Sequence, residues 1–328
     1  MRVTSTVVTD PKVWDTLAAS LGGGYFHSYA AAAYDAAGGG DPLFLQALDA
    51  GGACVGVVTG TLAASRRWPF SRYCNWAMLL SLPAVADGTE AMQRRVLEAV
   101  EEHLRGRGVF SVRIYSYDAM ASERVLGALG YQLSPRTEFY VDLTPTVGAI
   151  WGHFSGTRRT DLRKAEKLGV VTRLENTLEA LDLVSTFYAQ SMRRHEVVIA
   201  TPNEQATVAR RRQLESGHGD VLVTYWNGQP VNAALFGIFS QKPYYLTSGA
   251  SEAGYKCCGP AHLLWTAIQM YKDRGAACLN LGAALEDQTG LHRFKQDFGA
   301  TVVSAPIGVK RLSTLGSALH RIRSLLGR

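Results

Sequence analysis

The stretch Leu222–Val231 has the sequence LVTYWNGQPV, with the dipeptide Asn227-Gly228 between two apolar runs. Asn-Gly is typical of a two-residue hairpin turn, because both central positions of that turn need a positive φ. The stretch Leu45–Gly56 has the same form around Gly51-Gly52. Two hairpins at corresponding places predict that one α/β unit occurs twice in the chain.

The segments that follow the hairpins correspond as well. One expected helix ends at Gly108 before a strand at 109–116, and another ends at Gly275 before a strand at 277–281. Glycine is the usual residue just past a helix C-terminus. We therefore predict an α/β (α+β) fold built of two tandem units, each a mixed sheet flanked by helices.

The predicted domain boundary lies at Pro145, after a strand expected over 131–142. The predicted parts are an N-terminal domain over 1–145, a C-terminal domain over 146–309 and a basic amphipathic helix over 310–328. Such a helix packs on its own domain or rests on an anionic membrane surface or on tRNA.

The amino-acid composition indicates which class of protein the chain belongs to. Hydrophobic residues make up 47% and charged residues 19% of the chain, which is typical of a soluble globular protein. No run of about 18 apolar residues is present to span a bilayer. The N-terminus lacks a basic and apolar leader, so we expect a cytoplasmic protein.

Charge is unevenly distributed along the chain. Residues 1–145 hold 12 Lys and Arg with 14 Asp and Glu, whereas residues 146–328 hold 22 with 14. A basic second half fits a phosphate-bearing partner or a solvated basic face. The five cysteines show no CxxC spacing, and the eight histidines show no metal-ligand spacing, so we predict no metal site.

Several runs in the chain resemble the FemABX aminoacyltransferases, a family of tandem GNAT-like domains. The family transfers an amino acid from aminoacyl-tRNA to an amine, usually on a peptidoglycan precursor. The resemblance implies amide bond formation, with aminoacyl-tRNA as co-substrate and no cofactor. The matching runs are Asp142-Leu143, the Arg-rich segment that ends at Gly169-Val170, Phe187-Tyr188, the hairpin 220–239, Tyr244-Tyr245, Phe294-Lys295 and Phe298-Gly299.

Two departures from the family pattern bear on the substrates. Residues 170–220 leave room only for ordinary helices, whereas many Fem-type proteins insert a long helical arm presumed to contact tRNA. Arg193-Arg194-His195-Glu196-Val197 stands where the family usually has an acidic residue followed by Gly. A peptide-like natural product is therefore a second candidate acceptor beside a cell-wall precursor.

Amide formation from an ester needs stabilisation of the developing oxyanion and help for the departing ribose oxygen. A fixed cation in a low-dielectric cleft can supply each, typically worth about 3–4 kcal/mol. The resemblance implies that Phe294 and Lys295 lie at the catalytic centre, with Lys295 near the aminoacyl end of the tRNA. The residues alone also allow Phe294 and Phe298 to be core residues and Lys295 a solvated neighbour.

Candidate substrate contacts come from the same comparison and from residue chemistry. Guanidinium groups bind phosphate or carboxylate in a bidentate manner, and of two adjacent strand tyrosines one points inward. The candidates are Arg67, Trp76, Arg193, Arg194, Tyr244, Tyr245, Tyr255, Lys256 and Gly259.

A helix expected over 158–168 carries the candidate tRNA contacts Arg159, Arg163 and Lys164, with Arg159 and Arg163 one turn apart.

The sequence also allows two other functions. An acyl-CoA-dependent N-acyltransferase would bind pyrophosphate near Gly259, but Pro260 removes an amide N–H there. A non-catalytic module would use the basic second half to hold RNA or an anionic glycan.

Overall fold

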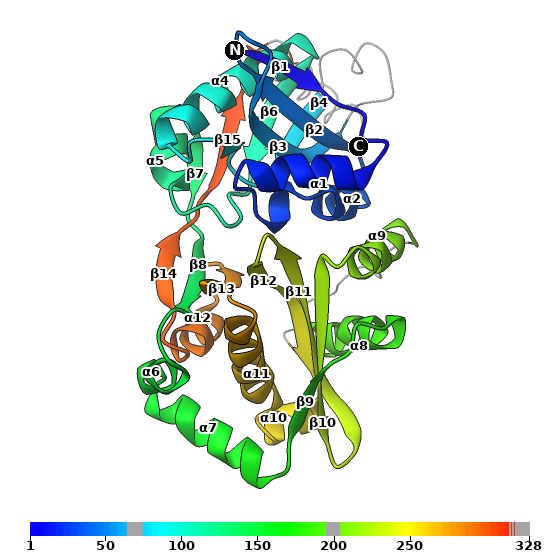
Figure 1. The fold of residues 1–328 in the computed structure, drawn as a ribbon, viewed down its shortest axis with the longest axis vertical. Coiled ribbons are helices and arrows are strands. Elements are labelled where there is room, and N and C mark those ends of the chain that lie inside the picture. The colour runs from blue at the N-terminus through cyan, green and yellow to red at the C-terminus, as the bar shows by residue number, and fades with distance from the viewer. Residues whose placement is uncertain (64–74, 195–203, 315, 317, 319–328) are drawn as a thin grey trace. The chain divides into compact units, whose positions relative to one another are not determined.

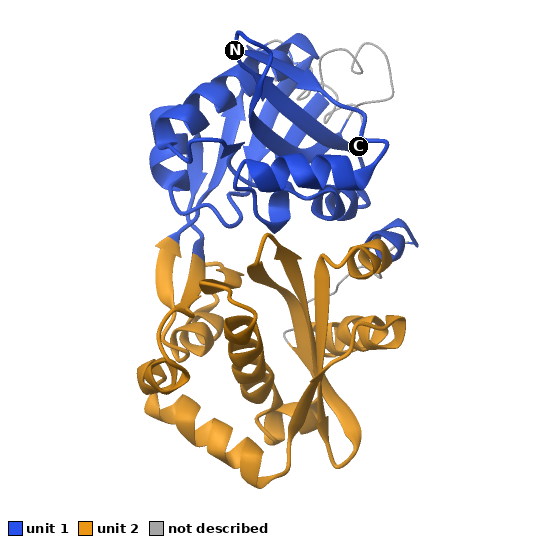
Figure 2. Cartoon of the chain, in the orientation of Figure 1, with its two compact units in different colours: residues 1–137, 203–209, 304–328 blue, residues 138–202, 210–303 orange. Residues whose placement is uncertain are grey.

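The computed structural model describes residues 1–63, 75–194, 204–314, 316 and 318. The chain forms two compact units (Figure 2). The first contains residues 1–137, 203–209 and 304–328, and the second contains residues 138–202 and 210–303. Each unit therefore takes parts from both halves of the sequence.

The sheet of the first unit has the strand order β1-β2-β3-β4-β6-β15-β7, with β5 beside β3 (Figure 1). Strands β4 and β6 are parallel. The elements of this unit are β1 (Arg2–Ser5), α1 (Pro11–Ser20), η1 (Tyr25–His27), α2 (Tyr29–Ala36), β2 (Asp41–Leu48), β3 (Cys54–Ala63), β4 (Asn75–Leu79), β5 (Ala84–Val85), α4 (Glu90–Gly106), β6 (Val109–Ile114), α5 (Ser122–Ala128), β7 (Gln132–Ser134) and β15 (Ile307–Arg311).

The sheet of the second unit has the order β14-β8-β13-β12-β11-β10-β9, and β12 and β13 are parallel. The remaining elements are β8 (Thr137–Asp142), α6 (Val147–His153), α7 (Gly156–Lys167), β9 (Val171–Leu174), α8 (Leu178–Arg194), α9 (Glu204–Glu215), β10 (Gly219–Trp226), β11 (Gln229–Phe239), β12 (Lys242–Ala250), α10 (Glu252–Lys256), α11 (Gly259–Asp273), β13 (Cys278–Ala284), α12 (Thr289–Gln296) and β14 (Thr301–Ser304).

The two sheets share one topology, which confirms the predicted duplication of a mixed α/β unit. Strand β15 lies between β6 and β7 in the first sheet, and β8 lies between β13 and β14 in the second. The two units have therefore exchanged one strand: β8 follows β7 in sequence but belongs to the other sheet. The predicted single strand over 131–142 is wrong for this reason.

The break between β7 and β8 has a local cause. Pro135 has no N–H to give to a strand ladder. Arg136, which is buried, donates from Nε to Ala305 O at 2.9 Å and from Nη2 to Tyr115 O. The compact units consequently divide at 137/138 and 303/304 instead of at the predicted 145 and 309.

The predicted C-terminal helix also begins too early. Lys310 and Arg311 belong to β15, where they pair with Val112 and Ser111 of β6. Leu312 is buried in the first core. Residues 319–328, most of the predicted helix, lie outside the described residues.

Each unit has its own apolar core. In the first, α4 presents Val96, Leu97, Val100 and Leu104 to the sheet, a helical spacing that places them on one face. In the second, α11 packs its apolar face against the strands. None of the helices described in the structure has the length and apolar character needed to cross a membrane.

The exchanged strand β15 is attached to α4 by an ion pair between half-buried Lys310 and buried Glu101. Lys310 Nζ lies 2.6 Å from Glu101 Oε2 and 5.3 Å from the centroid of the Tyr131 ring. We predict that Lys310→Met lowers the free energy of unfolding by about 3 kcal/mol, because Glu101 is left buried without its cation. Adding Glu101→Gln should recover part of this loss in urea unfolding. A double variant as unstable as the sum of the single variants would contradict the pairing.

Candidate functional site

Lys295 lies in α12 and is only 3% exposed. Its Nζ donates to Gly282 O at 2.9 Å and to Ala283 O at 2.8 Å, and it lies 5.3 Å from the centroid of the Phe139 ring. A buried ammonium is tolerated only when such acceptors replace water. Lys295 is therefore a buried, fixed cation, and the alternative of a solvated neighbour is wrong.

The C-terminal end of β13 supplies the carbonyl groups that bind this ammonium. Gly282 has φ 76°, and a Cβ there would lie 2.8 Å from Tyr245 O. Both observations require glycine, since other residues are strained at this φ and would strike the backbone of β12. At this point β13 presents two successive carbonyl groups, of Gly282 and Ala283, to Lys295.

Glu138 lies at the centre of a buried polar network beside this part of β13. It is fully buried, accepting at Oε1 from Tyr244 Oη at 2.8 Å and at Oε2 from Tyr140 Oη and Asn280 Nδ2, both at 2.9 Å. Asn280 Oδ1 accepts the N–H of Gly282 at 2.8 Å. We call Glu138, Tyr140, Tyr244, Asn280, Gly282 and Lys295 the Glu138 network.

Sequence reasoning identified Lys295 and Tyr244 but missed Glu138, Tyr140 and Asn280. A signal was present, because Glu138 precedes the apolar run Phe139–Val141 and Asn280 lies between two leucines. Buried polar side chains need partners. Which partners they find depends on β8 entering the second sheet, and the sequence pattern had not indicated that.

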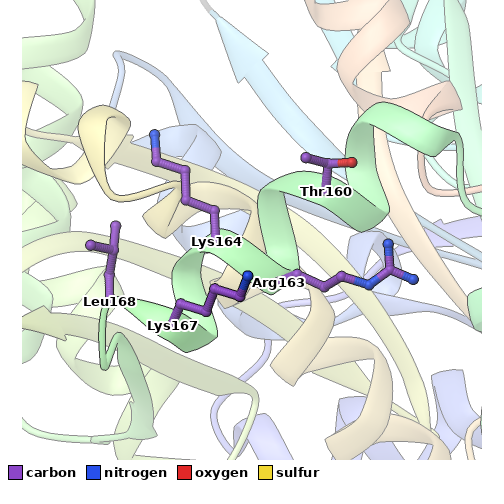
Figure 3. Close-up of a pocket in the computed structure, with 5 residues that line it drawn as sticks. All are labelled: Thr160, Arg163, Lys164, Lys167 and Leu168. Carbon is purple, nitrogen blue, oxygen red and sulfur yellow. The ribbon is translucent and has the colours of Figure 1, made fainter.

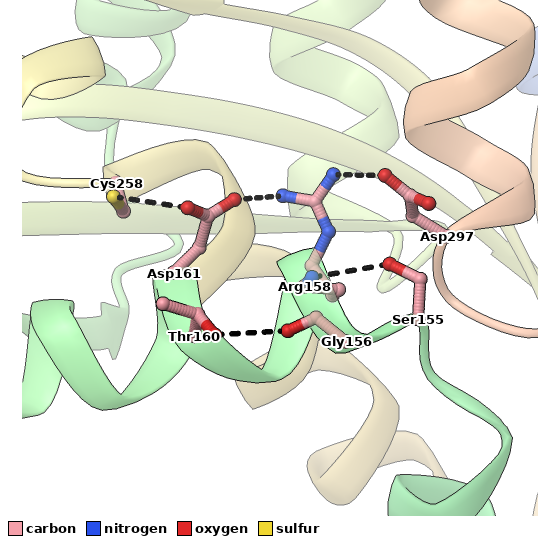
Figure 4. Close-up of polar contacts among 7 residues, drawn as sticks. All are labelled: Ser155, Gly156, Arg158, Thr160, Asp161, Cys258 and Asp297. Atoms are coloured by element: carbon pink, nitrogen blue, oxygen red, sulfur yellow. Dashed lines mark hydrogen bonds and ion pairs between the residues drawn. The ribbon is translucent and has the colours of Figure 1, made fainter.

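Phe294 turns away from its neighbour Lys295. It is half-buried, with its ring centroid 5.5 Å from that of Phe298 and 4.5 Å from the guanidinium carbon of Arg158. Arg158 is buried and forms ion pairs with Asp161 at 3.2 Å and Asp297 at 3.4 Å (Figure 4). Burial lowers the pKa of Arg158, and the two carboxylates oppose that shift.

The Arg158 cluster joins three helices. Ser155 Oγ caps α7 by accepting the N–H of Arg158 at 3.1 Å, and Asp297 follows α12. Cys258 Sγ, just before α11, lies 3.8 Å from Asp161 Oδ1 (Figure 4). Phe294 thus contributes to packing that holds α12, and with it Lys295, in place.

A second group of candidates gathers near the end of β12. The Arg194 guanidinium carbon lies 3.8 Å from the centroid of the Tyr255 ring, and Nη2 donates to Ser191 Oγ at 3.2 Å and to Ala250 O at 3.4 Å. Tyr245 packs on Phe236 and donates its hydroxyl to Ser248. The structure therefore brings Arg194 and Tyr255 together.

The remaining candidates are more dispersed. Arg193 is exposed, and Lys256 forms an exposed ion pair with Glu252 at 3.0 Å. A Cβ on buried Gly259 would lie 3.1 Å from Gly254 O, so this glycine serves the close packing of α10 and α11. Trp76 is 37% exposed on β4 of the first unit, and Arg67 lies outside the described residues.

The basic residues of α7 have different roles. Arg159 Nη1 donates to Gly152 O at 3.1 Å and to Phe154 O at 2.9 Å, which closes the end of α6. Arg163 and Lys164 line a hollow of about 510 Å³ (Figure 3). Thr160, Lys167 and Leu168 complete the lining, so Lys167 joins the predicted basic residues. We call Arg163, Lys164 and Lys167 the α7 basic group.

Burial raises the pKa of Tyr245 to about 12 from an ordinary value of 10, while the bond to Ser248 opposes the shift. The folded state then holds the phenol proton more tightly than the unfolded state, so this stabilisation is complete below pH 10 and is lost as pH rises toward 12. We predict that the free energy of unfolding falls across this range by about 2 kcal/mol more in the wild type than in Tyr245→Phe. Urea unfolding at pH 9, 10.5 and 12 measures it, and identical slopes would refute the assignment.

Comparisons with known proteins concern the fold and the segment that carries these residues. Residues 200–308, which include Tyr244, Asn280 and Lys295, match the model of the FemAB family. No curated protein sequence matches the chain. The crystal structure of FemX superposes with a TM-score of 0.73 at 13% identity, covering 93% of this chain and 96% of that one.

Two further structures share the fold. L-PGS from Bacillus licheniformis matches with a TM-score of 0.59 at 15% identity, covering 97% of this chain and 98% of that one. A tandem GNAT protein from the clavulanic acid biosynthesis pathway matches with a TM-score of 0.50 at 11% identity, covering 95% and 98%. The predicted class of tandem GNAT-like protein is confirmed, and the family match agrees with an amide-forming transferase. Residues 200–308 thus match the FemAB family, and the chain as a whole has the fold of FemX.

Proposed function

We propose that the chain transfers an aminoacyl group from aminoacyl-tRNA to an amine, forming an amide bond. The observation that carries the proposal is Lys295, a buried cation held by two carbonyl groups within the segment that matches the FemAB family. The reaction needs no metal or further cofactor, and an aminoacyl-tRNA donor places it in the cytoplasm.

The chemistry assigns Lys295 a defined task. The amine nitrogen attacks the ester carbonyl of the donor, and a C–N bond forms as negative charge develops on the carbonyl oxygen. The C–O bond to the ribose then breaks, and the ribose oxygen takes up the proton that the amine loses. A cation fixed in a site of low dielectric stabilises these charges more strongly than one in water.

The acceptor we propose is a peptidoglycan precursor or another peptide-like molecule that bears a free amine. Arg194 supports this choice, because its guanidinium is held over Tyr255 by a stacking contact and remains exposed. A guanidinium oriented in this way can bind a carboxylate or phosphate of the acceptor. Arg193 is exposed beside it.

The α7 basic group is the proposed contact for the tRNA backbone. Arg163 and Lys167 lie one helical turn apart, and among the described residues none of the three forms an ion pair with an acid. Arg159 is replaced in this role by Lys167, because its guanidinium is engaged with the carbonyls of Gly152 and Phe154.

A second candidate donor is acyl-CoA, which the shared fold of the tandem GNAT protein favours. Against it stands the start of α11, where Gly259 packs against Gly254 O and Pro260 offers no N–H to a pyrophosphate. Transfer of label from charged tRNA, run beside labelled acetyl-CoA, separates the two donors. Steeply salt-dependent RNA binding without transfer from either would support a binding module instead.

Lys295→Ala tests the catalytic cation. We expect the variant to fold and to bind tRNA while kcat for transfer falls about 10²- to 10³-fold, the usual loss when one stabilising donor is removed. Circular dichroism and single-turnover transfer of radiolabel to an amine acceptor measure this. Unchanged turnover would remove Lys295 from the mechanism.

The α7 basic group is tested by Arg163→Gln with Lys167→Gln. The double variant should bind uncharged tRNA more weakly, with a salt slope reduced by about 1 to 2 in a plot of log K against log salt concentration. Arg211→Gln with Arg212→Gln removes the same charge from exposed positions of α9 and serves as the control. Equal slopes in the two double variants would show that only net charge matters.

A further inference from the structure

We propose that Glu138 is a positioning residue for Lys295, acting through Asn280 and Gly282. The inference rests on the proposed catalytic role of Lys295. Glu138 lies in β8 and Lys295 in α12, and no direct bond between them is needed. The role follows from a chain of hydrogen bonds that joins the two side chains through the end of β13.

Three consecutive hydrogen bonds of normal length connect Glu138 to Lys295. Asn280 Nδ2 donates to Glu138 Oε2 at 2.9 Å, and the N–H of Gly282 donates to Asn280 Oδ1 at 2.8 Å. Lys295 Nζ then donates to Gly282 O at 2.9 Å. Glu138, Asn280 and Lys295 are each 3% exposed or less, so water does not readily replace any of these bonds.

The network requires a carboxylate at position 138, because both of its oxygens must accept hydrogen bonds. Both oxygens of Glu138 accept hydrogen bonds, and the donors include Tyr140, Tyr244 and Asn280. A glutamine at this position would direct an NH₂ group at one of these donors. If Asn280 rotated its amide to accept from that NH₂, it would lose its bond to the N–H of Gly282.

Loss of the Asn280–Gly282 hydrogen bond affects Lys295 through the backbone of Gly282. Gly282 already holds a positive φ, with Tyr245 O close to its Cα. The hydrogen bond at its N–H holds the peptide plane before Gly282 and so restrains the backbone that carries its carbonyl. Release of that bond loosens the backbone at Gly282 and Ala283, whose carbonyl groups accept from the Lys295 ammonium.

A second buried carboxylate in the same unit offers a matched control. Asp220 accepts from Tyr271 Oη at 3.2 Å and from Asn176 Nδ2 at 3.0 Å, and it pairs with Arg274. It is 6% exposed, and none of these partners belongs to the Glu138 network. Asp220→Asn therefore alters a buried, hydrogen-bonded carboxylate that has no described bond to Gly282.

The first test measures Lys295 itself. Folded protein is treated with acetic anhydride, and peptide mass spectrometry gives the acylation rate of the Lys295 amine. We expect Glu138→Gln to raise this rate at least tenfold and Asp220→Asn to leave it near the wild-type value. Asn280→Ala, which retains Glu138 and both tyrosines, should act like Glu138→Gln and substitutes for it if that variant fails to fold.

The proposal is overturned if Glu138→Gln and Asn280→Ala label like the wild type, or if Asp220→Asn labels as fast as they do. Labelling requires no substrate, so its outcome is independent of the proposed function. A positive labelling result without transfer from any donor would keep the positioning role and reject the aminoacyl transfer.

The second test applies once transfer is measured. If Glu138 acts through Lys295, Glu138→Gln lowers kcat with little change in KM, and the double variant with Lys295→Ala is no slower than Lys295→Ala alone. Losses of kcat that multiply in the double variant would overturn the coupling.

Discussion

The burial of the Lys295 ammonium is the constraint on which the candidate site depends. An ammonium removed from water costs several kcal/mol unless acceptors surround it. Two carbonyl groups at the end of β13 meet that need, and they can do so because Gly282 adopts a positive φ beside the backbone of β12. The glycine, the strand end and the cation are therefore one structural unit.

The strand exchange supplies the other half of the site. Glu138 and Tyr140 belong to β8, which comes from the first half of the sequence and inserts beside β13. Without that insertion Asn280 would lack its buried acceptor. The exchange thus brings residues from both halves of the sequence into one site, since one half carries the carboxyl group and the other carries Lys295.

The residues that the family resemblance predicted as one site lie in separate clusters in the structure. Lys295 and Tyr244 join the Glu138 network, whereas Phe294 packs with Arg158 and Phe298, and Arg194 stacks on Tyr255. Arg159 closes α6, and Lys167 lies with Arg163 and Lys164 on the hollow of α7. A motif in sequence states which residues are adjacent in the chain, but side chains of adjacent residues point in different directions.

The sequence alone determined the local structure and the duplication. Asn227-Gly228 and Gly51-Gly52 specify hairpins, and Gly108 and Gly275 end helices, because φ preferences act within a few residues. It also indicated Lys295 and Tyr244. Only the tertiary structure decided that β8 and β15 change sheets and that Glu138 meets Asn280 and Tyr244, because strand pairing and the partners of a buried polar group depend on residues far apart in the chain.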